Sequence, residues 1–162
     1  MTPAETSAML ENTPNLSLAT LDRDGYPHLV AMSFAVDPDG NIVMTSFGKA
    51  QKVINLKRNP RVAVMVEHGR AYDKIKGVMI RGVAEVIHDT EAVLATMKLV
   101  VSKMARIAGK ETTPDDVVIT EGYRRQAAKR AVIRIHPEKW ASWDHSKLAG
   151  AAAAGPMAKD KN

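Results

Sequence analysis

The 162-residue sequence contains no cysteine and few aromatic residues. The lack of cysteine excludes a disulfide framework, a thiolate zinc site and a cysteine nucleophile, and it suits a reducing cytoplasm. No apolar run approaches the roughly 18 residues that a membrane span needs. The N-terminus lacks the charged segment and apolar run of a signal peptide. We therefore expect a soluble, cytoplasmic protein that has no membrane partner.

Motifs of several familiar sites are also absent. No Gly-x-Gly-x-x-Gly follows a predicted strand, and Gly48-Lys49-Ala50 lacks the spacing and the hydroxyl of a P-loop. No Gly-x-Ser-x-Gly elbow indicates an activated-serine hydrolase. The five histidines show no metal-ligand spacing, such as a pair four residues apart on a helix. These absences argue against a P-loop enzyme, a dinucleotide-binding fold and a metal site.

The charge that is present favours an anionic partner. Lysine and arginine number 23 against 18 acidic residues, which gives a formal net charge of +5. Nucleic acid is one anionic partner, but no helix-turn-helix, zinc or RNA-binding aromatic signature accompanies the charge. A small molecule that bears phosphate is the better candidate.

The hydrophobic pattern predicts a mainly β protein with a few helices. Strands are predicted at 16–22, 28–36, 41–46, 61–67, 76–87 and 131–135, the last of them closed by Pro137. Helices are predicted directly after residue 48, at 90–108, and as a basic helix through Arg124 and Arg130. Neighbouring strands that follow one another in sequence favour a small antiparallel barrel of about six strands. Residues 1–148 are expected to form one domain, and 149–162 a disordered tail.

The stretch from Ser46 to Arg61 holds five basic residues and no acid. Thr45 and Ser46 end a predicted strand, and Lys49 and Lys52 fall near the start of the next helix. Backbone N–H groups and the helix dipole favour an anion at that position. The residues alone leave two interpretations open, a phosphate site and a solvated helix face.

This stretch resembles the flavin-phosphate segment of the pyridoxamine 5'-phosphate oxidase-like split β-barrels. In that family a lysine ahead of an Asn-Pro pair contacts the cofactor phosphate, as Lys52 stands ahead of Asn59-Pro60 here. Residues 18–28 resemble the opening hairpin of the family, and residues 78–86 its later central strand. The resemblance covers roughly residues 5–148. It implies a split β-barrel, FMN-binding in type, that forms a homodimer with the cofactor at the subunit interface.

The C-terminal part narrows the resemblance. True pyridoxamine phosphate oxidases carry an Arg-x-His-Asp-Arg-like segment there, whereas this chain has Trp140 and Trp143 followed by Asp144-His145. That ending resembles the flavin/deazaflavin oxidoreductases of actinobacteria, particularly the branch that uses the deazaflavin coenzyme F-420. The resemblance implies hydride transfer from the reduced coenzyme to an unsaturated organic substrate. Alternatives are an FMN-dependent oxidase or reductase and a non-catalytic carrier of the coenzyme or of haem.

The resemblance also implies positions for the site. Phosphate contacts are expected from Thr45, Ser46, Lys49 and Lys52, and ring contacts from two strands. The full set of expected cofactor-binding residues is Met32, Ser33, Thr45, Ser46, Lys49, Lys52, Asn55, Ile80 and Arg81. Cations that could meet the anionic tail of the deazaflavin, or else simply face water, are Lys57, Arg58, Arg124, Arg125 and Lys129. Trp140 and Trp143 are expected either to line the substrate pocket or to pack on the barrel. No catalytic side chain is assigned.

Overall fold

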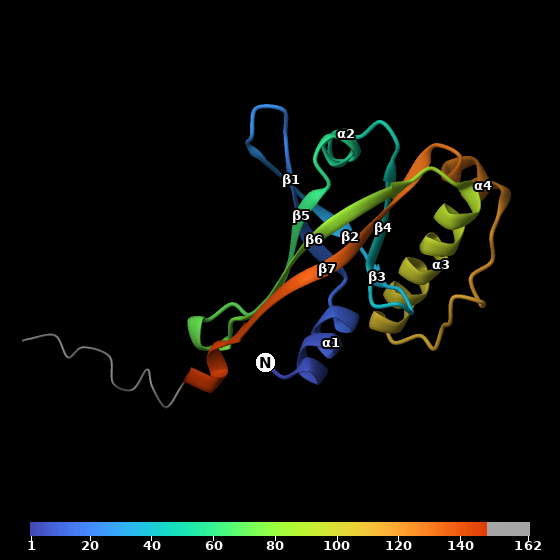
Figure 1. The fold of residues 1–162 in the computed structure, drawn as a ribbon. Coiled ribbons are helices and arrows are strands. Elements are labelled where there is room, and N and C mark those ends of the chain that lie inside the picture. The colour runs from blue at the N-terminus through green and yellow to red at the C-terminus, as the bar shows by residue number, and fades with distance from the viewer. Residues whose placement is uncertain (149–162) are drawn as a thin grey trace, which may run out of the picture.

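The computed structural model describes residues 1–148, in which a seven-stranded antiparallel sheet dominates (Figure 1). The predicted tail, 149–162, lies outside the described residues. The strands are β1 Asn15–Leu21, β2 Pro27–Ser33, β3 Ala35–Val36, β4 Ile42–Phe47, β5 Arg61–His68, β6 Lys76–Ile87 and β7 Arg130–Asp144. The helices are α1 Pro3–Asn12, α2 Gln51–Arg58, α3 Thr90–Ile107 and α4 Glu121–Ala127, with single 3-10 turns at Tyr72–Lys74 and His145–Leu148.

The sheet curls because its two edge strands are consecutive in the chain. The strand order is β2-β1-β5-β6-β7-β4-β3, and only Phe34 separates β2 from β3. One residue spans less than about 4 Å, so the two edges must lie close together. Phe34 itself is fully buried. The predicted mainly β, antiparallel barrel is confirmed, with seven strands because the expected strand 28–36 crosses from one edge to the other at Phe34.

The barrel interior holds the main core. Inward residues of β1 and β5 alternate with outward ones, as in the buried pair Leu18 and Val64. Helix α2 adds Val53 and Leu56 to this core, and α1 adds Leu10. Figure 1 shows α2 at one end of the barrel and α1 at the other. The two short helices therefore close the ends that the strands leave open.

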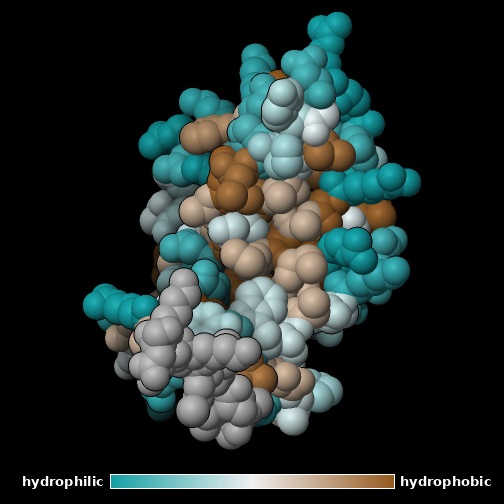
Figure 2. All heavy atoms as spheres, turned by 90° about the vertical axis from the view of Figure 1, so that its left-hand side faces the viewer, coloured by the Kyte–Doolittle hydropathy of each residue, from teal (hydrophilic) through white to brown (hydrophobic). Residues whose placement is uncertain are grey.

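Helix α3 covers only part of the outer surface. It packs on β3, β4 and the first half of β7, where Val93, Leu94, Ala127 and Val132 form a second cluster. Among residues 1–148, no helix packs over the outer surface of β2, β1, β5, β6 and the second half of β7. We call this surface the open face, and its side chains are mostly small or apolar: Leu29, Ala31, Ser17, Ala19, Ala63, Met65, Met79 and Ala141. Figure 2, which looks from the side away from α3, shows apolar residues gathered on the molecule.

Helix α1 is absent from the sequence prediction. A capping box starts it: the Thr2 hydroxyl accepts from the Glu5 backbone N–H, and the Glu5 carboxylate accepts from the Thr2 N–H. The Thr-x-x-Glu spacing was available in the sequence. Within residues 1–148, none of the helices combines the length and the apolar character that crossing a membrane requires.

Two predicted boundaries near the C-terminus are wrong. The strand does not close at Pro137, because a register shift opposite Arg81 and Gly82 leaves room for Glu138 as a bulge, and β7 continues to Asp144. The basic helix stops at Ala127 and does not include Arg130, because Arg130 pairs with Phe47 of β4. Long-range pairing decides both boundaries.

Candidate functional site

A basic recess of about 650 Å³ lies where β4 ends, β7 begins and α2 passes by. Four of its lining residues are cations. No residue of its lining within 1–148 is an aspartate or a glutamate. The lining consists of Phe47, Gly48, Lys49, Lys57, His88, Ala128, Lys129 and Arg130. We call this hollow the basic recess.

Pairing between β4 and β7 assembles the basic recess. Phe47 lies opposite Arg130, and the Gly48 N–H donates to the Lys129 carbonyl at 3.0 Å. The Arg130 guanidinium sits 4.4 Å from the centroid of the Phe47 ring. Its Nε is buried without a hydrogen-bond partner in the described part of the chain. A buried donor of this kind is costly unless an acceptor reaches it, so the site fits an anionic ligand.

The start of α2 adds to this preference. Its N-cap residue is Ala50, which has no side-chain acceptor for the first N–H groups. Lys52 lies in the first turn, where a cation opposes the helix dipole. Burial, followed by repulsion from Arg130, lowers the pKa of Lys52. A bound anion would accept from the free N–H groups at the start of α2. It would also attract both Lys52 and Arg130 and so offset their mutual repulsion.

Of the residues that were predicted for the phosphate, the two lysines lie at or near the basic recess, whereas the two hydroxyl residues do not lie together. Lys49 lines the basic recess, and Lys52 lies close enough to Arg130 to be affected by its charge. Thr45 and Ser46 point to opposite sides of β4, as neighbours in a strand do, and Ser46 is buried. They do not converge on one point as a pair.

Asn55 has a structural role in this fold. It is completely buried, its Nδ2 donates to the Thr20 hydroxyl at 3.0 Å, and its Oδ1 accepts from Gln51 at 2.8 Å. Arg58, predicted as a candidate for the tail, instead donates to the Leu21 carbonyl at 2.6 Å. These contacts fasten α2 to β1.

The residues that were predicted for the cofactor ring do not line the basic recess. Ile80 is buried in the barrel core, and Met32 packs partly against that core. Ser33 donates to Asn15 at 2.8 Å, and Arg81 is exposed on the outside of β6. Of the further candidate cations, Arg124 forms an ion pair with Glu91 at 3.0 Å.

Two smaller hollows flank α1 at the opposite end of the barrel. One, of about 350 Å³, has Trp140 and Ser142 on one side and the α1 residues Pro3, Thr6 and Ser7 on the other, with Met1. We call it the Trp140 recess. Trp143 takes no part in it, because its ring lies against Gly77, where a Cβ atom would come within 2.0 Å of Trp143 Cζ2.

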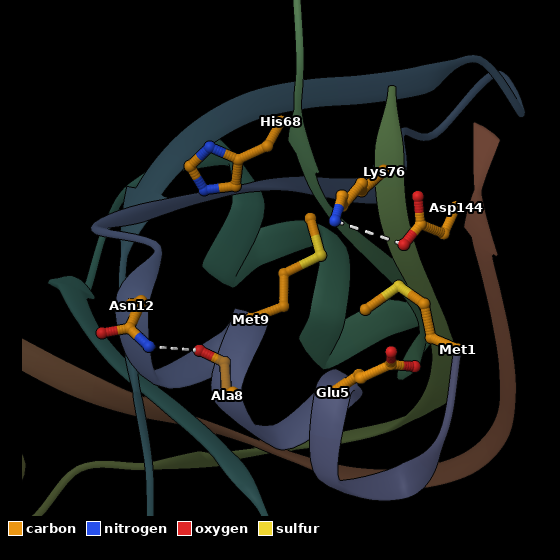
Figure 3. Close-up of a pocket in the computed structure, with 8 residues that line it drawn as sticks. All are labelled: Met1, Glu5, Ala8, Met9, Asn12, His68, Lys76 and Asp144. Atoms are coloured by element: carbon orange, nitrogen blue, oxygen red, sulfur yellow. Dashed lines mark hydrogen bonds and ion pairs between the residues drawn. The ribbon is translucent and has the colours of Figure 1, made fainter. Parts of the chain in front are cut away.

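The second of these hollows, also of about 350 Å³, is shown in Figure 3. Met1 and Met9 point toward its centre, and the pair Lys76–Asp144, at 3.2 Å, closes one side. A hydrogen bond from Ser146, together with Lys76, lowers the pKa of Asp144. Since its lysine is already paired, this hollow does not share the excess positive charge of the basic recess.

A family model described as pyridoxamine 5'-phosphate oxidase matches residues 2–144. The chain belongs to this family. Among family relatives, a 5a,11a-dehydrotetracycline/5a,11a-dehydrooxytetracycline reductase of Streptomyces rimosus is 30% identical over 146 residues, which are 88% of this chain and 81% of the relative.

Solved structures agree with this family membership. The conserved hypothetical protein Rv2991 from Mycobacterium tuberculosis is 32% identical and superposes with a TM-score of 0.77, over 100% of this chain and 93% of that one. An F420 reductase is 27% identical with a TM-score of 0.60, over 83% of this chain and 94% of that one. The family resemblance drawn from the sequence is thereby confirmed, and the chain belongs to a family of oxidoreductases.

Sequence reasoning underrated part of the basic recess of this family member. His88 was given no role in the sequence analysis, and Lys129 and Arg130 were predicted to lie on or beside a basic helix. All three line the basic recess. No local signal marks them. The pairing of β4 with β7 brings Lys129 and Arg130, more than 80 residues along the chain, to Gly48, and the ring of His88 reaches Gly48 from 40 residues away. Lys57 was a doubtful candidate and also lines the recess.

Proposed function

We propose that this protein is a coenzyme F-420-dependent reductase, which transfers a hydride from the reduced deazaflavin to an unsaturated organic substrate. The observation that carries this proposal is the excess of cations in the basic recess, where the described residues bring together Lys49, Lys57, Lys129 and Arg130 and no carboxylate. A flavin mononucleotide presents one phosphate. The deazaflavin presents a phosphodiester and several glutamates, which call for more cations.

The relatives support a reductive reaction. One acts, by its name, as a reductase of dehydrotetracyclines, and another is described as an F420 reductase. A dehydrotetracycline is an unsaturated polycyclic molecule, so a conjugated ring or an enone is the class of acceptor we propose. The Trp140 recess suits such a molecule, since it combines an indole surface with the hydroxyls of Thr6, Ser7 and Ser142.

The protein supplies binding and orientation in this proposal. Lys49, Lys52 and the first N–H groups of α2 hold the phosphate, and Arg130 offers its unpartnered Nε. When bound, the coenzyme supplies the hydride. No side chain is assigned as proton donor, and solvent serves that role.

The proposal includes a homodimer. Trp140 lies ten residues along β7 from Arg130, about 30 Å at the usual rise of a strand. That separation exceeds the ribityl chain that joins ring and phosphate in such coenzymes. A second copy, packed on the apolar part of the open face (Figure 2) and leaving Arg61, Arg81 and Lys139 of that face uncovered, would bring its Trp140 recess toward the basic recess of the first. Ser33 and Arg81 lie on the outside of the sheet and remain candidates for ring contacts. Met32 lies on the edge strand β2, and the buried Ile80 precedes Arg81 on β6.

Titration of the purified protein with each cofactor tests the proposal. We expect colourless protein that changes deazaflavin fluorescence on binding and binds flavin mononucleotide more weakly. Protein purified with a yellow chromophore, or with a higher affinity for flavin mononucleotide, favours the FMN-dependent alternative. Tight binding of the reduced coenzyme with no oxidation by any conjugated acceptor favours the carrier alternative.

A further inference from the structure

A second basic hollow lies on the outside of the sheet, at the bulge between β6 and β7. It has a volume of about 580 Å³ and three cations from three adjacent strands: Arg61 of β5, Arg81 of β6 and Lys139 of β7. Its other lining residues are Val62, Gly82, Val83 and Glu138. We call it the bulge recess. Of its residues only Arg81 was named by the family resemblance, as a ring contact, and Arg61 and Lys139 have no role assigned so far.

The strand register places like charges directly against each other there. Arg81 lies opposite Lys139, and Arg61 is one step along the same face from Ala63, which lies opposite Arg81 on the other side. Like charges directly across a ladder destabilise a sheet. None of the three cations has a carboxylate within ion-pair distance in residues 1–148.

The same ladder pairs its charges elsewhere. Lys76 of β6 meets Asp144 of β7 at 3.2 Å, and Arg134 of β7 meets Glu85 of β6 at 3.8 Å. Between these two pairs, where the bulge opens the ladder, Arg81 and Lys139 are left without a carboxylate partner in the described part of the chain. This sheet therefore pairs cations with carboxylates on either side of the bulge but not at the bulge itself.

The bulge is built into the backbone. A Cβ on Gly82 would lie 2.1 Å from the His136 carbonyl oxygen, so the close approach requires glycine. Glu138, the extra residue of β7, is exposed and is the one carboxylate of the recess. Three cations against one carboxylate leave the hollow with a net positive charge.

We propose that the bulge recess binds the carboxylate groups of a small polyanion. Two guanidinium groups present the planar fork that matches carboxylate oxygens. The recess has no helix N-terminus, unlike the basic recess, and it lies nine residues along β7 from Arg130. It is thus a site separate from the phosphate site. If the proposed function holds, the carboxylates come either from the glutamates of the coenzyme tail or from an acidic hydride acceptor.

Citrate is the probe for the first experiment, which needs no coenzyme. Calorimetry compares the wild type with the double variant R81Q/K139Q and with the control K110Q/R70Q, which loses the same charge from exposed sites outside the recess. We expect R81Q/K139Q to weaken citrate binding by at least about tenfold, as the loss of one charge-assisted hydrogen bond does, and the control to change it little. Equal weakening in both variants, or no citrate binding by the wild type at millimolar concentration, overturns the proposal.

The second experiment identifies the source of the carboxylates. Greater weakening by R81Q/K139Q for the coenzyme with several glutamates than with one assigns the recess to the tail. A rise in KM for a carboxylated acceptor but not for its methyl ester assigns it to the acceptor. If R81Q/K139Q changes neither the affinity for the coenzyme nor the KM of the acceptor, the recess plays no part in the reductase reaction. Failure of the wild type to bind the coenzyme would refute the proposed function and leave the citrate result standing.

Discussion

The ammonium group of Lys103 lies 3.3 Å from the centroid of the Phe34 ring, and both side chains are buried. Lys103 comes from α3, and Phe34 is the residue at which the chain crosses between the two edges of the sheet. The Nζ atom has no hydrogen-bond partner in the described part of the protein. The aromatic face is therefore its main compensation, worth up to about 2 kcal/mol when desolvated.

Stability should rise with pH because of Lys103. Burial lowers its pKa from 10.5 to about 8, although the charge of Glu11 opposes the shift. Between these two values the unfolded chain binds more protons than the folded one, so the free energy of unfolding increases with pH. The cost is fully present below about pH 8 and is relieved as pH approaches 10.5. Urea unfolding across this range measures it.

Lys103→Met should remove this pH dependence. At neutral pH we expect a gain on the order of 1–3 kcal/mol, because a buried cation that Phe34 and Glu11 compensate only in part is replaced by an apolar side chain of similar length. The difference between variant and wild type should shrink as pH rises toward 10.5. A difference that stays constant over that range would show that charge is not the cause.

Asn55→Ala should destabilise the protein by about 1–3 kcal/mol, since it leaves the buried Thr20 hydroxyl without its donor. The matched control is Thr20→Val. If the hydrogen bond is the reason, the double variant N55A/T20V loses less stability than the two single losses added together. Chemical unfolding of the four proteins gives the coupling energy, and strict additivity would contradict this role.

Gly77→Ala should destabilise the protein by about 1–3 kcal/mol, the usual cost of overpacking. The new Cβ would lie 2.0 Å from Trp143 Cζ2, so the indole must move. In the background of Trp143→Ala the same substitution should cost little. Thermal unfolding of the single and double variants measures the difference, and tryptophan fluorescence reports the displaced ring. An equal cost in both backgrounds would exclude the indole as the cause.

Lys52→Ala should weaken coenzyme binding by about 1.5–3 kcal/mol, the range for a hydrogen bond to a charged group, with little loss of stability. Lys110→Ala, at an exposed position, is the control. Burial and Arg130 lower the pKa of Lys52 in the free protein, and a bound phosphate would raise it. Binding in alkaline solution should therefore take up protons, which calorimetry in buffers of different ionisation enthalpy detects. Unchanged affinity in K52A would refute the phosphate assignment.

Local sequence patterns predicted much of this fold. Alternating apolar residues predicted β1 and β5, and the change to a helical period predicted α3 close to its observed bounds. The lysines that precede Asn59-Pro60 were predicted as anion contacts, and two of them, Lys49 and Lys57, line the basic recess. These features depend on residues only a few positions apart, which is why a single sequence displays them.

The tertiary structure decided what depends on distant pairing. It made 28–36 into two strands on opposite edges, carried β7 through Pro137, and brought Lys129 and Arg130 to Gly48. It also buried Asn55, which the sequence had offered as a cofactor contact. Strand order and register depend on contacts between remote segments, and no local period encodes them. The sequence by itself therefore determined the family, the mainly β class and the lysines that we propose for the phosphate, whereas only the paired sheet decided which further cations join them and which stand apart at the bulge.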